Sequence, residues 1–89
     1  MKAEFKRMRS VNKSYDQQGE IFFACRNYAN QPPGVQKKIR DLCENVGQES
    51  APALLAYLTT DISWQQTCIQ YALSEETLRR LRRKFYNAW

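Results

Sequence analysis

The sequence contains no histidine, and its three cysteines include no Cys-x-x-Cys pair. Zinc sites in proteins are built from these two residue types at short spacings, so we expect no metal centre. The chain also has no glycine-rich phosphate loop and no close carboxylate pair beside a nucleophile, which removes the usual means of catalysis. The sequence therefore predicts a protein that is not an enzyme and that uses no cofactor or small-molecule substrate.

Long apolar runs are missing as well. No run approaches the roughly 20 residues that a membrane-spanning helix needs. Met1 leads into a polar, basic stretch that lacks the apolar core of a signal peptide, so we expect a cytoplasmic protein. Cys25, Cys43 and Cys68 each fall in an apolar stretch. This placement predicts free, buried thiols in a reducing compartment.

The chain of 89 residues is long enough for one small domain, and its net charge of +5 is unevenly distributed. Residues 1–13 carry five basic side chains and one acidic side chain, residues 14–73 carry four basic and six acidic ones, and residues 74–89 carry five basic and two acidic ones. Positive charge at both ends of a chain favours a polyanionic partner such as a nucleic acid. Cationic, solvated termini without a partner are the alternative.

Apolar residues recur with helical spacing, and no strand-like alternation is present. We expect an all-α fold with five helices, covering about residues 16–30, 34–47, 50–61, 63–72 and 74–86. Residues 14–89 would form this single helical domain. Residues 1–13 show no period and would form a basic N-terminal arm that is mobile in the free protein.

Several residues have the side chains expected at helix ends. Gly47 is expected to end the second helix in a left-handed conformation. Ser50 is expected to cap the third helix, whose first turn tolerates Pro52. Ser63 and Gln66 have the spacing of a capping box at the start of the fourth helix.

The segment at about 63–86 has the pattern of a helix-turn-helix. The facing positions near the turn must be small, and Cys68 and Ala72 satisfy this need. Leu73 can enter the core from the turn. The second helix needs apolar residues three or four positions apart to hold it in place, and these are Leu78, Leu81 and Phe85. This arrangement leaves the start and the outer face of the second helix free for DNA.

This segment resembles helix-turn-helix regulators, with Cys68 where alanine is common and Ala72 where glycine is common. The phrase from Ala72 to Phe85, ALSEETLRRLRRKF, is also similar to the ends of small phage and prophage late-transcription activators of Gram-positive bacteria. These are the autolysin-regulator-like proteins, which are themselves similar to the last DNA-binding region of sigma factors. The resemblance covers about residues 54–86. It implies double-stranded DNA as the partner, contact through residues 74–83 and a role in phage gene expression.

Arginine binds phosphate or guanine edges through two parallel hydrogen bonds, so Arg79, Arg80 and Arg83 are the main candidates for DNA contact. A solvated helical face is the alternative. The predicted DNA-binding set also includes residues at the starts of the two helices: Gln65, Ser74, Glu75 and Glu76. Ser74 would cap the last helix and the two glutamates would face its positive end, which explains these three without DNA. The candidate contacts to the DNA backbone are Lys6, Arg7, Arg9 and Lys84.

Other partners are compatible with the same pattern. A second hypothesis is a protein-interaction module, an adaptor or inhibitor of a nucleic-acid machine, in which the arginine face meets an acidic partner and Tyr86 or Trp89 anchors the interface. Trp64 and Tyr71 are expected in the core. A membrane-surface helix is the weakest hypothesis, because the last helix is expected to pack on the helix before it. A DNA-binding monomer of this size would bind weakly, so RNA polymerase or a homodimer partner is expected to assist.

Overall fold

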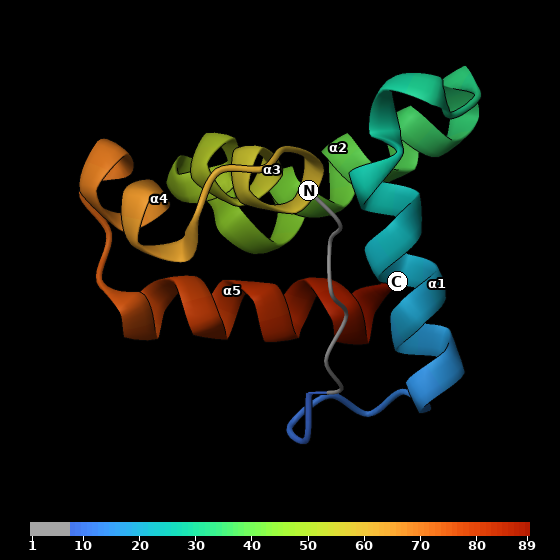
Figure 1. Cartoon of the computed structure of the whole chain (residues 1–89), viewed down its shortest axis with the longest axis horizontal. Helices are drawn as coiled ribbons and strands as arrows, with labels where there is room; N and C mark the ends of the chain where they lie inside the picture. Colours follow the sequence, from blue (N-terminus) through green and yellow to red (C-terminus); the bar gives the residue numbers. More distant parts are fainter. Residues whose placement is uncertain (1–7) are drawn as a thin grey trace.

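The computed structural model describes residues 8–89, which fold into five α-helices and two short 3-10 turns without a strand in that part of the chain (Figure 1). The elements are α1 (Tyr15–Arg26), η1 (Tyr28–Asn30), α2 (Pro33–Gly47), η2 (Gln48–Ser50), α3 (Ala51–Thr59), α4 (Trp64–Tyr71) and α5 (Glu75–Ala88). The expected all-α fold is therefore confirmed, and so is the number of helices in the described residues.

Helix α1 begins at a reciprocal capping box. Ser14 Oγ accepts from the backbone N–H of Gln17, and the Gln17 side chain accepts from the backbone N–H of Ser14. The helix ends at Arg26, earlier than expected, and the chain continues as the 3-10 turn η1. Gln31 Nε2 donates to the carbonyl of Ala24 at 3.2 Å, and the backbone N–H of Asn27 donates to the carbonyls of Phe23 and Cys25.

Helix α2 carries the expected apolar stripe. Ile39 and Cys43 are buried on it, with Leu42 and Val46 packed against the core beside them. The prediction for Gly47 is wrong, because Gly47 keeps a right-handed helical conformation with φ −97° and ψ −26°. The positive φ of 49° falls on Gln48 instead. Gly47 is buried beside Ala51 and Leu54 of α3, and it takes no part in the reversal of the chain.

Helix α3 is apolar and lies at the centre of the domain. It buries Ala53, Leu54 and Leu58, and it contacts α1, α2, α4 and α5. Pro52 stands in its first turn, as expected. The prediction that Ser50 caps this helix is wrong. The 3-10 turn η2 runs directly into α3, so Ser50 takes φ −93° and ψ 7° and makes no side-chain capping bond.

The helices enclose one core, and α5 forms one side of it. Figure 1 shows α5 running across the lower half of the molecule, with α3 and α4 above it and α1 crossing near its C-terminal end. Helix α2 packs against both α3 and α5. Cys25 and Cys43 are buried free thiols, as expected, whereas Cys68 is only half-buried. This arrangement leaves the lower edge of α5 free of other helices.

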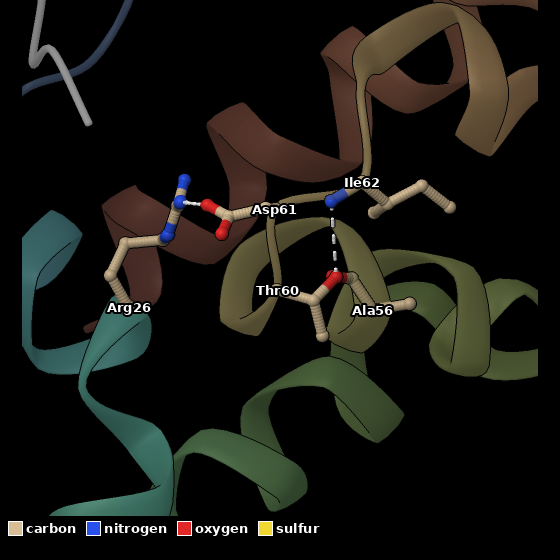
Figure 2. A network of polar contacts seen from close by, with 5 residues as sticks. All are labelled: Arg26, Ala56, Thr60, Asp61 and Ile62. Atoms are coloured by element: carbon tan, nitrogen blue, oxygen red, sulfur yellow. Dashed lines mark hydrogen bonds and ion pairs between the residues drawn. The ribbon is translucent and has the colours of Figure 1, made fainter. Parts of the chain in front are cut away.

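The loop between α3 and α4 is tied to α1 and closed on itself (Figure 2). Arg26, the last residue of α1, forms an ion pair with Asp61 in this loop. Thr60 Oγ1 donates to the carbonyl of Ala56 at 2.6 Å and accepts from the backbone N–H of Ile62 at 3.3 Å. These contacts fix the point at which the chain leaves α3, and hence where α4 begins.

Candidate nucleic-acid interface

Helices α4 and α5 are joined by a tight turn over residues 72–74. Ala72 has φ 55° and ψ 46°, the left-handed helical conformation. The backbone N–H groups of Ala72 and Leu73 both donate to the carbonyl of Cys68, so the end of α4 is closed by the bonds typical of a left-handed C-cap. Leu73 follows and packs against the core, as expected. The turn therefore redirects the chain within three residues and anchors it at the same time.

Both helices start with a serine cap. Ser63 Oγ accepts from the backbone N–H of Gln66 at 3.0 Å, and Ser74 Oγ accepts from the backbone N–H of Thr77 at 3.1 Å. Ser74 also donates to Thr77 Oγ1 at 2.8 Å. The expected caps are confirmed at both starts, although the described residues show the full reciprocal box at Ser14 rather than at Ser63.

The predicted apolar seam of α5 is buried. Leu78 and Phe85 are 0% exposed and Leu81 is 5% exposed. The seam is wider than expected because Tyr86 is also buried, so Tyr86 is not available as the surface anchor that the second hypothesis assigns to it. Tyr86 directly follows Phe85 and its ring lies 6.2 Å from that of Phe85, on the edge of α5 that faces the core. Burial raises the pKa of the Tyr86 hydroxyl above its ordinary value.

The opposite side of α5 carries four exposed cationic side chains, which we call the basic face: Arg79, Arg80, Arg83 and Lys84. No ion pair involves any of them within residues 8–89. Arg79 and Arg83 are four residues apart, as are Arg80 and Lys84, so they form two adjacent rows along the helix. Their charges are thus available to an external anion.

Arg82 is the exception among the cations of α5. Its guanidinium lies over the ring of Trp64, 4.8 Å from the ring centroid, and its Nε is buried without a hydrogen-bond partner in the described residues. A cation over an indole face is a favourable contact, and here it joins α5 to α4. Arg82 therefore serves the packing of the two helices and is not part of the basic face.

The two glutamates at the start of α5 have different surroundings. Glu75 Oε1 accepts from Trp64 Nε1 at 3.2 Å, so this carboxylate is engaged within the domain. Glu76 is exposed and lies one helical turn before Arg79 and Arg80, which places a negative charge at the start of the basic face. Both lie in the first turn of α5, as predicted, where the helix dipole favours negative charge.

The other residues predicted for the site or for the core beneath it lie outside α5. Gln65 is exposed in the first turn of α4, and Trp64 and Tyr71 on the same helix are half-buried. Arg9 is exposed in the segment that precedes α1. Lys6 and Arg7 lie outside the described residues. The structure thus brings Ser74, Glu75, Glu76 and the arginines together on one helix, with Gln65 on its neighbour.

Two features of this region could not be predicted from the sequence. One is the contact of Trp64 with Glu75 and Arg82, described above. The other is Asn87, whose Oδ1 accepts from the backbone N–H of Asn12 at 2.7 Å, across 75 positions of the chain. The period of α5 places Asn87 outside the apolar seam, but no local pattern indicates a partner so far away in the sequence. Trp89, expected at the surface, is half-buried with Lys38 Nζ 4.0 Å from its ring centroid.

Other kinds of site find little support in the described residues. They contain no group of three or more histidine, cysteine or acidic side chains that could hold a metal ion. None of their helices is both long and apolar enough to cross a membrane. Comparison with known proteins gives no match to a family model, to a curated protein or to a solved structure.

Proposed function

We propose that this protein is a DNA-binding transcriptional regulator that inserts α5 into the major groove as the second helix of a helix-turn-helix. The observation that carries the proposal is the basic face: Arg79, Arg80 and Arg83 are exposed and have no ion-pair partner in the described residues, while the opposite side of the helix is buried. A helix held from behind in this way can enter a groove without losing its own packing.

The turn before α5 supports the same proposal. Helix-turn-helix regulators commonly have glycine at the position that Ala72 occupies, and glycine is favoured where φ is positive. Ala72 has φ 55° here, so the backbone takes the conformation that glycine would favour although the residue is alanine. Ser74 and Glu76, at the exposed start of α5, would then lie nearest the base edges.

Arginine has the chemistry that this site requires. Its guanidinium stays charged at any relevant pH and can bind two acceptors of guanine or of a phosphate at once. We assign Arg79, Arg80 and Arg83 to bases or phosphates in the groove, and Lys84 to the flanking backbone. Regulation of phage genes in the cytoplasm, with RNA polymerase or a second copy of the chain as a further partner, is the role that the resemblance favours.

An acidic protein partner is the second candidate, and Ile69 is the observation that favours it. This residue of α4 is 75% exposed, and a large apolar side chain at the surface is suited to a protein contact. The anchors expected for such a partner are weaker than the sequence indicates, because Tyr86 is buried and Trp89 is covered by Lys38. Duplex DNA remains the better fit to a surface whose exposed residues are mainly cationic.

The test is selection of duplexes from a random pool, followed by binding measurements over a range of salt concentrations. Replacing Arg79, Arg80 and Arg83 together by alanine should weaken binding at least 100-fold. It should also reduce the slope of log affinity against log salt by about two to three, because each phosphate contact contributes about 0.9. The far-ultraviolet circular dichroism should stay unchanged, since the three side chains are exposed.

A matched control removes the same amount of charge elsewhere. Lys37, Lys38 and Arg40 are exposed on α2, where they contact Asp41, the ring of Trp89 and the Tyr28 hydroxyl respectively. Their triple alanine variant should bind DNA nearly as the unchanged protein does. An equal loss of DNA affinity in the two variants would mean that binding depends only on net charge and not on the basic face. Absence of any duplex affinity at low salt would overturn the proposal.

A further inference from the structure

The segment before α1 is fixed to the domain over residues 8–13, which we call the N-terminal loop. Val11 in this loop is only 6% exposed and belongs to the hydrophobic core. The loop was expected to be part of a mobile arm, yet its backbone makes several specific contacts with α1 and α5. The remainder of the expected arm, residues 1–7, lies outside the described residues.

Gln18 of α1 holds both ends of this loop. Its Oε1 accepts from the backbone N–H of Met8 at 2.7 Å. Its Nε2 donates to the carbonyl of Met8 at 3.1 Å and to the carbonyl of Lys13 at 2.9 Å. Gln18 is 0% exposed, and a buried amide is tolerated only where its hydrogen-bonding groups are satisfied. The loop supplies partners for this amide, so its path across the domain is determined by a residue of the core.

Asn87 attaches the middle of the loop to α5. Its Oδ1 accepts from the backbone N–H of Asn12 at 2.7 Å. Asn87 lies four residues after Arg83 and eight after Arg79, so the three residues form one row along the outer side of the helix. Figure 1 shows the loop, in blue, below the C-terminal half of α5. The loop is therefore seated at the end of the row that carries the basic face.

The loop adds positive charge at this place. Arg9 is exposed, and Lys13 is half-buried at the rim of an open depression of about 230 Å³ that Glu20 and Trp89 also line. The loop has no acidic residue of its own. No ion pair involves Arg9 or Lys13 in the part of the chain that the structure describes. The loop thus adds two cations without an ion pair in the described residues, close to the C-terminal end of α5.

The dimensions of DNA indicate which part of a duplex Arg9 and Lys13 would contact. Arg79 and Asn87 are eight residues apart, which corresponds to about 12 Å along a helix. The major groove is also about 12 Å wide. With α5 directed across the groove and Arg79 inside it, this length brings the C-terminal end of α5 and the attached loop to the sugar–phosphate backbone at the edge of that groove.

We propose that the N-terminal loop is a second phosphate-binding element, in which Arg9 and Lys13 contact the DNA strand that borders the groove occupied by α5. Asn87 is a positioning residue, since it holds the loop beside the basic face through Asn12 and does not itself need to touch DNA. This inference rests on the proposed function, because it assigns the loop to the same duplex.

The experiment measures affinity and its salt dependence for the selected duplex and for an unrelated duplex. Replacing Arg9 and Lys13 together by alanine should weaken binding to both duplexes by a similar factor of about 10, because phosphate contacts carry no sequence information. The slope of log affinity against log salt should fall by about one to two. The double variant of Lys37 and Arg40, which loses the same charge from α2, should leave the slope unchanged.

Asn87→Ala tests the positioning role with both cations still present. Amide hydrogen exchange at Asn12 should become faster, and the salt slope should fall toward that of the variant without Arg9 and Lys13. Faster exchange with an unchanged slope would overturn the role of Asn87. Loss of binding in the variant of Arg79, Arg80 and Arg83, together with normal binding after the loss of Arg9 and Lys13, would overturn the loop proposal alone. Failure of the unchanged protein to bind any duplex would overturn both proposals.

Discussion

The indole Nε1–H of Trp64 donates to Glu75 Oε1 at 3.2 Å and so joins the first residue of α4 to the first residue of α5. The same ring lies 4.8 Å below the guanidinium of Arg82 and 5.1 Å from the ring of Tyr57 in α3. Three helices therefore meet at one side chain. Trp64 determines how α5 is held against α4, and hence which side of α5 is exposed.

Removal of Trp64 should lower the stability of the whole domain. We expect Trp64→Ala to reduce the free energy of unfolding by about 2–3 kcal/mol, somewhat less than for a fully buried tryptophan. Trp64→Phe keeps an aromatic ring but loses the hydrogen bond to Glu75, which should cost about 1 kcal/mol. Urea unfolding followed by circular dichroism measures both values. Ile69→Ala on the same helix is the control, because Ile69 is 75% exposed and its replacement should change stability little.

Ala72 provides a test of the turn. An alanine with φ 55° is in a conformation that glycine adopts without steric cost, so Ala72→Gly should raise the free energy of unfolding by about 0.5–1 kcal/mol. Ala24→Gly, within helix α1, should lower it by about 1 kcal/mol, because glycine is a poor helix former. Thermal unfolding of the two variants under one set of conditions measures both changes. A loss of stability on Ala72→Gly would contradict the left-handed conformation of the turn.

The region from Ser63 to Phe85 could be predicted from the sequence because its determinants are local. Serine caps act on backbone groups three residues away, and the seam of Leu78, Leu81 and Phe85 recurs with the period of the helix itself. A short stretch of sequence therefore contains the information that places these helices and exposes Arg79. Binding of DNA by the exposed face is not a local property, because it depends on the shape and charge of a partner outside the chain.

The features that sequence analysis missed depend on contacts between distant residues. Tyr86 follows directly after the predicted seam, and only the packing of other helices against α5 determines that it is buried. The N-terminal loop is held by Gln18 and by Asn87, from two different helices. A basic segment without periodicity resembles a mobile arm unless these partners are known. Long-range hydrogen bonds of this kind leave no pattern in the sequence.

Gly47 and Gln48, at the end of α2, are two positions at which a substitution should stabilise the domain. Gly47 is right-handed and helical, and a Cβ there would lie 3.7 Å from the Ala51 Cβ and 3.8 Å from Leu54 Cδ2, which are ordinary contacts. Gly47→Ala should therefore raise the free energy of unfolding by up to about 1 kcal/mol. Gln48→Gly should also stabilise the domain, since Gln48 has the positive φ of 49°.

Differential scanning calorimetry of Gly47→Ala, of Gln48→Gly and of the double variant measures these effects. The two sites are adjacent, so their contributions need not add. Gly34→Ala is a suitable comparison, because a Cβ at Gly34 would meet no atom within 4 Å and the residue lies in the first turn of α2. A lower midpoint for Gly47→Ala would mean that Ala51 and Leu54 cannot accommodate the added methyl group.

Two buried thiols and a buried tyrosine hydroxyl, which ionise only at high pH, predict a loss of stability in alkaline solution. Burial raises the pKa of the Cys25 thiol from 9.0 to about 12, and it does the same for Cys43. Burial also raises the pKa of Tyr86. The folded domain therefore keeps these protons at pH values where the unfolded chain has released them. The contribution of these groups to stability should be complete below about pH 9 and should be lost between about pH 9 and 12.

Each thiol should lower the free energy of unfolding by up to about 1.4 kcal/mol per pH unit within that range, and Tyr86 should do so from about pH 10 upward. Urea unfolding at pH 7, 9, 10 and 11 measures the slope. Tyr86→Phe keeps the buried ring and removes the ionisable hydroxyl, so its slope above pH 10 should be smaller than that of the unchanged protein. Cys43→Ala should reduce the slope from about pH 9 upward. Profiles that run parallel for all three proteins would mean that the buried groups ionise without unfolding the domain, contrary to their position in the core.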